Sequence, residues 1–199
     1  MAISADQVKA LRDATGAGMM DSKRALEANN GALEKAKDWL RQKGMAKAGA
    51  KATRTAREGI IATYVHHNHQ LGVLLELNSE SDFVARNDEF RHLAHEIAVH
   101  VAAAEPKYLR REDVPTDVLD RERAIFEAQA KDQKKPEAVI EKIIQGKMND
   151  FYKREVLLDQ AWAKDDKRTV EQMLKEAIAK LGENITISRF ARFKVGEAS

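Results

Sequence analysis

The spacing of hydrophobic residues predicts three short helices within about the first 45 positions. The first begins after Ser4, which together with Gln7 has the spacing of a helix capping box, and its apolar stripe starts at Val8. It ends at Gly16, because glycine readily adopts the positive φ that terminates a helix. Two further helices are expected over residues 19–28 and, beyond a turn at 29–31, over the positions that place Leu33, Ala36 and Leu40 on one side. A bundle this small has a marginal core, which contacts with a partner would help to stabilise.

Alternation of apolar and polar residues predicts three β-strands farther along the chain. Residues 60–65 are β-branched and aromatic, and residues 71–77 place alternate apolar side chains on one face. Residues 66–70 join these two strands as a hairpin loop. The third strand, 185–195, alternates Ile185, Ile187, Ala191, Phe193 and Val195 with polar residues. We therefore expect a small antiparallel sheet whose third strand is half-buried.

Four stretches beside these strands have the period of amphipathic helices. They cover 82 to about 104, 116 to about 132, 136 to about 155, and 170–181, where Gly182 stops the last helix. The pattern predicts an α+β fold, with a three-helix bundle of the ubiquitin-associated type followed by a helix-rich core with a small antiparallel sheet. We expect the bundle and a basic linker over residues 1–54, and the core over 55–199 with a helical segment at about 116–181.

Charge is uneven along the chain, although the net charge is only +2. Residues 1–58 carry 12 basic and 7 acidic residues, whereas the remainder carries 22 and 25. Residues 44–57 are rich in Ala and Gly and contain four basic residues and no acidic one, which indicates a partly helical linker. A basic front end suits an acidic partner or RNA, but a solvated helical face explains so small an excess more simply.

Composition excludes several classes of protein. Hydrophobic residues make up 43% of the chain, enough for a folded core, and only 3 Pro and 10 Gly argue against long disordered stretches. The chain has no Cys, so it has no disulfides and no thiol chemistry. No apolar run approaches the ~20 residues of a membrane span, and no secretory leader is visible. We expect a cytoplasmic protein.

Neither group of histidines has the spacing of a metal site. The three histidines of residues 66–69 lie on one predicted hairpin tip without a nearby carboxylate, and neighbouring loop residues rarely point at one centre. His95 and Glu96 begin a zinc-protease motif, but its second His would stand at position 99, which is Val99. We therefore expect no metal site.

The sequence also lacks the motifs of nucleotide binding and of catalysis. Thr15–Gly18 is short and contains glycine, yet no P-loop Lys-Ser/Thr pair follows it, and nothing matches the dinucleotide fingerprint. No catalytic triad and no pair of catalytic carboxylates stands out. We expect a binding protein that is not an enzyme and that holds no cofactor.

The most informative segment directly follows the second predicted strand. Ser81, Asp82, Phe83 and Val84 open a helix, so free backbone N–H groups, a helix dipole, an acid and an aromatic ring come together there. Such a tip is suited to reach into a partner and disturb an anion or metal site. Phe83 also lies seven residues before Phe90, on nearly the same helical face, so periodicity alone equally allows Phe83 to be a core residue.

Two methionines offer a second candidate contact. Met19 and Met20 are adjacent on the second predicted helix and therefore point about 100° apart. A small bundle buries one of them more easily than both, and an exposed Met makes an adaptable contact surface. From the residues alone, packing in the core or at the edge of the bundle is the simpler interpretation.

Thr15–Lys23 and Ser81–Arg86 together resemble the bacterial translation elongation factor Ts family. The resemblance runs the length of the chain and includes Glu76–Asn78, Leu157–Gln160 and Gly182–Ile185. At one position the chain departs from the family pattern, because Ser81 stands where a Thr usually precedes Asp-Phe-Val. Both residues carry a hydroxyl that can cap a helix, so we expect little change.

The resemblance implies a guanine-nucleotide exchange factor that promotes GDP release from elongation factor Tu. In the family, the residues that match Ser81–Val84 push into the G domain of the partner beside its Mg²⁺ ion, so the resemblance favours a wedge role for Phe83. The loop and helix that match Met19, Met20 and Lys23 dock on the same domain, which favours a contact role for them as well.

The resemblance also implies a homodimer. Longer family members carry a duplicated core half, whereas this chain has one, so two chains would pair and form a 2:2 complex with elongation factor Tu. The amphipathic strand 185–195 is the candidate interface, because an unpaired edge with an apolar face favours association.

Two rival classes stay open from the sequence. An RNA- or ribosome-associated helical protein that uses the basic linker would bind RNA with a steep salt dependence. A hydrolase that uses the histidine-bearing helix would contain metal when purified. The favoured interpretation involves no membrane and no direct contact with nucleic acid.

Overall fold

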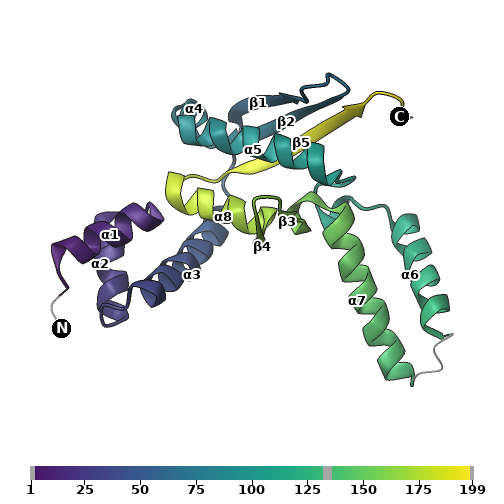
Figure 1. Cartoon of the computed structure of the whole chain (residues 1–199), viewed down its shortest axis with the longest axis horizontal. Coiled ribbons are helices and arrows are strands. Elements are labelled where there is room, and N and C mark those ends of the chain that lie inside the picture. The colour runs from purple at the N-terminus through teal and green to yellow at the C-terminus, as the bar shows by residue number, and fades with distance from the viewer. Residues whose placement is uncertain (1–2, 132–135, 198–199) are drawn as a thin grey trace. The chain divides into compact units, whose positions relative to one another are not determined.

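The structure, a computed structural model, describes residues 3–131 and 136–197. These residues form helices α1 Ala5–Thr15, α2 Met19–Ala28, α3 Leu33–Lys51, α4 Asp82–Ala85, α5 Asp88–Ala104, α6 Thr116–Lys131, α7 Glu137–Glu155 and α8 Val170–Leu181, strands β1 Glu58–Val65, β2 Leu71–Ser79, β3 Ala161–Trp162, β4 Asp165–Thr169 and β5 Thr186–Lys194, and 3₁₀-helices Arg111–Asp113 and Leu157–Asp159 (Figure 1). The predicted α+β class with a small antiparallel sheet is confirmed. No helix among the described residues is long and apolar enough to cross a membrane.

The chain divides into two compact units, each assembled from segments that are distant in sequence. The first unit takes residues 1–59, 78–90 and 172–186, and the second takes residues 60–77, 91–171 and 187–199. Both segments that carry candidate contact residues, 15–23 and 81–86, therefore belong to the first unit.

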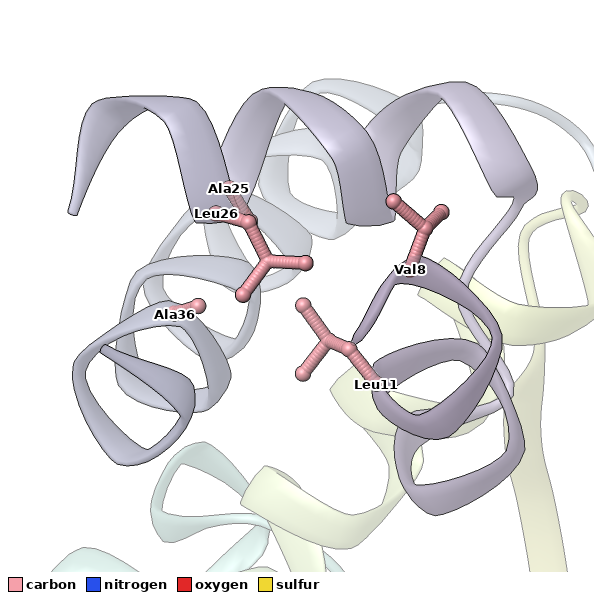
Figure 2. Close-up of a cluster of buried hydrophobic side chains, with 5 residues drawn as sticks. All are labelled: Val8, Leu11, Ala25, Leu26 and Ala36. Atoms are coloured by element: carbon pink, nitrogen blue, oxygen red, sulfur yellow. The ribbon is translucent and has the colours of Figure 1, made fainter. Parts of the chain in front are cut away.

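Helices α1, α2 and α3 surround a small apolar core in the first unit. Figure 2 shows Val8 and Leu11 of α1 converging with Leu26 of α2, and Ala25 and Ala36 complete the cluster. Partly buried apolar side chains close its margins, namely Ile3, Leu33, Trp39 and Leu40. The three-helix bundle expected from the hydrophobic spacing is thus present.

The ends of these helices follow the predicted signals. The Ser4 hydroxyl accepts the Gln7 N–H while the Gln7 side chain accepts the Ser4 N–H, so the capping box forms. Gly16, with φ of 68°, ends α1. α3 continues to Lys51, so the linker is partly helical, as expected, and a Cβ added at its Gly44 would lie 3.0 Å from the side chain of Ala179 on α8.

The three-stranded sheet has the strand order β1-β2-β5, which leaves β5 at an edge. The β1–β2 hairpin closes where the His66 N–H donates to the Leu71 carbonyl at 2.8 Å. At one end of β5, the Val195 N–H donates to the Gln70 carbonyl at 2.9 Å. The hairpin loop therefore lies where the sequence predicts it.

Helix α5 lies along one face of this sheet in the second unit. The Tyr64 ring of β1 meets His95 of α5 edge-on, with ring centroids 6.1 Å apart, and Arg192 of β5 forms an ion pair with Glu105. The side of α5 that bears Ala94, Ile97 and Val101 is fully buried, as the apolar spacing predicts.

Three details of the core differ from the sequence prediction. The helix expected from 82 to about 104 is two helices, α4 and α5, with Arg86 and Asn87 between them. The short antiparallel pair β3–β4 was not expected, because its few, mostly polar residues carry no alternation. The predicted burial of the apolar face of β5 is confirmed at Ile187 but wrong at Phe193, which is 67% exposed. Val195, which is 72% exposed, lies just after the end of the strand.

Helices α6 and α7 pack against each other as a hairpin in the second unit. Phe151 of α7 is buried in a cluster to which Val118 and Phe126 of α6 contribute. Arg123 of α6 and Glu141 of α7 form an ion pair at 3.1 Å. The packed side of α6 therefore carries Val118 and Phe126, while Ile125 of the same helix is exposed.

Candidate functional site

The first candidate element is the tip, Ser81–Val84, at the predicted junction of strand and helix. β2 ends at Ser79, and Ser81 is the N-cap of the single turn α4, with extended backbone angles of φ −126° and ψ 157°. The Ser81 hydroxyl accepts the Val84 N–H at 3.5 Å. Ser81 thus acts as the cap that the sequence predicts for this position.

The side chains of the tip have unlike surroundings. Phe83 is 81% exposed, so the interpretation of Phe83 as a core residue is wrong. Val84 is half-buried. Asp82 forms an ion pair with Arg86 at 2.9 Å, one helical turn away, and both groups face solvent. The tip therefore presents an aromatic ring without a protein cover and a carboxylate with an exposed, weakly held partner.

A set of hydrogen bonds, which we call the clamp, fixes the backbone just before the exposed ring. The Glu183 carboxylate accepts both the Ser81 N–H, at 3.0 Å, and the Ser81 hydroxyl, at 2.6 Å. In the opposite direction, the Glu80 carboxylate accepts the Asn184 N–H at 2.6 Å. The segment of Glu80 and Ser81 and the segment of Glu183 and Asn184 thus each supply a carboxylate that accepts a backbone N–H of the other. Hydrogen bonds to a charged acceptor are stronger than neutral ones.

The end of α3 and the residues after it also contact the clamp. Buried Asn184 donates from its side chain to the Arg54 carbonyl at 2.7 Å, and the Arg54 guanidinium lies 3.5 Å from the Glu80 carboxylate. The Lys51 ammonium donates to the Gly182 carbonyl at 2.5 Å. Three segments of the first unit therefore meet beside the tip.

The second candidate element is the patch formed by Met19, Met20 and Lys23 on α2. Met19 and Met20 are 49% and 60% exposed, whereas Ala25 and Leu26 of the same helix are buried. Core packing is therefore wrong for both methionines. Lys23 is also largely exposed and lies 3.8 Å from Glu27, a loose pair on one face of the helix.

The histidines take structural positions in the described part of the chain. His66 accepts or donates one hydrogen bond with the Tyr64 hydroxyl at 2.8 Å, beside the hairpin turn. No group of three or more His, Cys, Asp or Glu among the described residues is placed to hold a metal ion.

His100 differs from the other histidines because it is buried inside the second unit. Its Nδ1 accepts the Ala163 N–H at 3.3 Å, so Nε2 carries the proton and donates to the Gln160 side-chain oxygen at 3.0 Å. The ring stacks on Trp162. Burial lowers the pKa of His100, and the hydrogen bond with Gln160 offsets part of that effect.

The sequence pointed to Ser81–Val84, Met19, Met20 and Lys23, and the structure exposes Phe83, Met19 and Met20 at the surface. The sequence did not indicate that Glu183 and Glu80 are neighbours of the tip. Glu183 is 102 positions from Ser81, and one acidic residue among 32 carries no local signal for such a contact. The only sign in the sequence was the family landmark Gly182–Ile185, for which no role could be inferred.

Comparison with known proteins gives one consistent result. The family model described as Elongation factor TS matches residues 25–197. The Elongation factor Ts of Thermosipho melanesiensis is 57% identical over 195 residues, covering 98% of this chain and 100% of that protein. The proteins of the same name from Fervidobacterium nodosum and Geobacter sulfurreducens are 54% and 51% identical over 197 residues, covering 99% of this chain and 100% and 91% of theirs.

These matches define a translation elongation factor. The chain belongs to the elongation factor Ts family. The matched range of the family model contains the tip and the clamp residues Glu80, Glu183 and Asn184. The patch precedes that range and is covered only by the alignments with the relatives, which span nearly the whole chain.

Proposed function

We propose that this protein is a guanine-nucleotide exchange factor that releases GDP from elongation factor Tu in the cytoplasm, without making or breaking a covalent bond. The tip Ser81–Val84 enters the G domain of the partner beside its Mg²⁺ ion, with Phe83 as the wedge and Asp82 as the polar anchor. The metal and the β-phosphate then lose contacts, and GDP leaves faster. The observation that carries this proposal is an aromatic ring 81% exposed on a fixed backbone.

The energetics of the tip support this role. Burial of a whole Phe side chain contributes about 1.5–3 kcal/mol, and the free protein leaves nearly all of that unrealised at Phe83. The gain is available only in a complex that opens a site for the ring. If that site exists mainly in the nucleotide-free partner, the factor binds that state better and shifts the equilibrium toward it.

Reciprocal coupling completes the cycle. A factor that weakens GDP binding to its partner must itself bind more weakly when GDP is present, by the same ratio of affinities. GTP that enters the empty complex therefore displaces the factor. No site for nucleotide on this chain is required.

Release of labelled GDP from elongation factor Tu tests the function directly. Catalytic amounts of the wild-type protein are expected to speed release, and Phe83→Ala is expected to lose most of that effect. Ile125→Ala is the matched control, because Ile125 is an exposed apolar residue on α6. Release that does not change even with excess wild-type factor would sink the proposal.

The patch is proposed to dock on the same G domain, within a module of residues 1–54. Two exposed methionines beside an exposed lysine support an adaptable contact with a polar rim. Met19→Ala with Met20→Ala should raise the factor concentration at half-maximal release more than it lowers the maximal rate. Lys23→Ala should do the same to a smaller extent, and Lys9→Ala, on an exposed part of α1, serves as its charge control.

The core of residues 55–199 is proposed to form a homodimer through β5 and the sheet face beside it. Apolar side chains are exposed on the strands of this sheet and directly after β5, namely Ile61, Val65, Leu74, Phe193 and Val195. A groove of about 380 Å³ lies between Val65, Leu71 and Phe193. An exposed apolar face on an edge strand supports self-association and, with two partners, a 2:2 complex. Light scattering should report a dimer for the wild type and a monomer for Phe193→Lys.

A further inference from the structure

The tip raises the question of what holds Phe83 in position before a partner arrives. The exposed ring itself makes little contact with the protein, so packing of Phe83 cannot orient it. Helix α4 has four residues, and a single helical turn is not stable by its own hydrogen bonds. The orientation must therefore come from the backbone on either side of α4.

We propose that Glu183 is a positioning residue for nucleotide exchange, an inference that rests on the function proposed above. Its carboxylate holds the N–H and the hydroxyl of Ser81, the residue that caps α4 and precedes Asp82. Through Ser81 it fixes the direction in which α4 leaves β2, and so the direction of Phe83. The ring is thereby presented to the partner without a further ordering step.

The contact at Ser81 is charge-assisted through a carboxylate. Two donors on one residue meet the two oxygens of one side chain, at 3.0 Å and 2.6 Å. A carboxylate offers only acceptors, whereas an amide offers one oxygen and an NH₂ group that cannot accept. The Ser81 hydroxyl is also an acceptor, so in Glu183→Gln it can receive the amide NH₂. The variant keeps the size of the side chain and turns both charge-assisted hydrogen bonds into weaker neutral ones.

The second half of the clamp keeps the Glu183 loop in place when its carboxylate is changed. Asn184 is held through its N–H by Glu80 and through its side chain by the Arg54 carbonyl. Lys51 holds the Gly182 carbonyl on the other side of Glu183. A change at Glu183 is therefore expected to loosen the tip while the rest of the first unit keeps its fold.

Loss of positioning affects the maximal rate more than the affinity. A loosened tip has to be ordered in the complex, and that cost appears in the step that expels GDP. Docking through the patch is a separate contact and stays available. We expect Glu183→Gln to lower the maximal rate of GDP release roughly tenfold, because charge-assisted hydrogen bonds are replaced by neutral ones about half as strong.

The experiment uses full-length protein and four variants: Glu183→Gln, Phe83→Ala, the double variant and Glu89→Gln. Glu89 is the matched control, because it forms an ion pair with Lys180 of α8 and so joins the same two segments outside the clamp. Release of labelled GDP is measured over a range of factor concentrations, which separates maximal rate from half-saturation. Hydrogen exchange at the Ser81 amide reports the contact itself.

The expected results are specific to positioning. Glu183→Gln lowers the maximal rate, leaves half-saturation within about twofold because docking is unchanged, and speeds exchange of the Ser81 amide, while Glu89→Gln matches the wild type. The double variant is no slower than Phe83→Ala alone, since Glu183 acts through Phe83. Two further variants test the other partner of the hydrogen bond: Ser81→Ala should repeat the loss, and Ser81→Thr, which keeps a hydroxyl, should retain the wild-type rate.

Three outcomes would overturn the inference. Glu183→Gln with a rapidly exchanging Ser81 amide and a wild-type rate would show that the clamp does not serve exchange. A double variant slowed by the product of the two single effects would show that Glu183 does not act through Phe83. If Phe83→Ala is slow and Glu183→Gln is normal, only the positioning role is wrong, whereas a wild-type factor without effect overturns the proposed function and this inference with it.

Discussion

Phe83 and Phe90 stand seven residues apart, and the protein treats them in opposite ways. Phe90 is completely buried at the start of α5, whereas Phe83 is 81% exposed on α4. A single helix through both would have placed them on nearly the same face. The break at Arg86 and Asn87 separates the two faces, so one segment carries both a core residue and a candidate wedge.

The opposite exposure of Phe83 and Phe90 shows that α4 and α5 are held in place by different kinds of contact. α5 is fixed by its side chains, since Phe90, Ala94, Ile97 and Val101 are all fully buried. α4 has Ala85 as its one buried residue and is fixed by hydrogen bonds from the N–H and the hydroxyl of Ser81 to Glu183. A surface that must offer an apolar side chain to a partner cannot use that side chain for its own stability, so polar contacts take over.

The largest expected effect tests the comparison itself. Phe90→Ala should lower the free energy of unfolding by roughly 3–5 kcal/mol, as truncation of a buried Phe does. Phe83→Ala should change it by less than about 0.5 kcal/mol, because the ring is already exposed to water. Denaturant unfolding of both variants measures the two values. A Phe83→Ala variant that loses as much stability as Phe90→Ala would contradict the exposed position of Phe83.

Much of the fold was predictable from the sequence because its signals are local. The capping box at Ser4, the positive φ at Gly16 and the hairpin loop before Leu71 each depend on a few neighbouring residues. The break between α4 and α5 was missed because its cap is a single Asn side chain within a continuous apolar period. The β3–β4 pair was missed because its polar residues give no alternation.

The candidate site was predictable only in part. The exposed tip and patch could be proposed from residue type, and resemblance to a family decided between contact and core packing. The clamp was out of reach, because Ser81 and Glu183 meet only through tertiary folding. Residues that face a partner can be predicted from the sequence more readily than the residues that hold them in place.

The next effect depends on pH and concerns how α5 is held. Burial keeps His100 neutral by lowering its pKa, so the unfolded chain takes up a proton first as pH falls through about 6.5. The free energy of unfolding should therefore be highest above that pH and should decrease below it. Burial raises the pKa of Glu155, but its hydrogen bonds and ion pairs with Arg154 and Lys107 outweigh burial and lower it. Measurement between pH 7.5 and about 5 therefore stays above the range in which Glu155 loses its charge.

Two histidine variants identify the source of this pH dependence. His100→Gln should be less stable at neutral pH and should lose the pH-dependent part that the wild type shows. His92→Gln, at an exposed position of the same helix, should keep the wild-type slope. An unchanged slope in His100→Gln would assign the dependence to another group.

A smaller effect is expected at the break between the two helices. The Asn87 side-chain oxygen accepts the Glu89 N–H at 2.8 Å and so caps the first turn of α5. Asn87→Ala should lower the free energy of unfolding by about 1 kcal/mol, the usual cost of a lost cap, and Asn87→Asp should retain most of it. If Asn87→Ala were neutral, the break would depend on packing of Phe90 alone.

The smallest expected effect is at Arg86, which follows α4 and pairs with Asp82 at the start of that helix. Arg86 and Asp82 form an exposed ion pair, and such pairs contribute between about zero and 1 kcal/mol. Arg86→Ala should therefore leave thermal unfolding nearly unchanged. It also frees the Asp82 carboxylate for the partner, so maximal GDP release should stay within about twofold of the wild type. Asp82→Asn, which removes the proposed anchor, is the contrasting variant and should slow release more. A tenfold loss in Arg86→Ala would mean that the ion pair is itself needed to orient α4, and that the tip is held by its side chains as well as by its backbone.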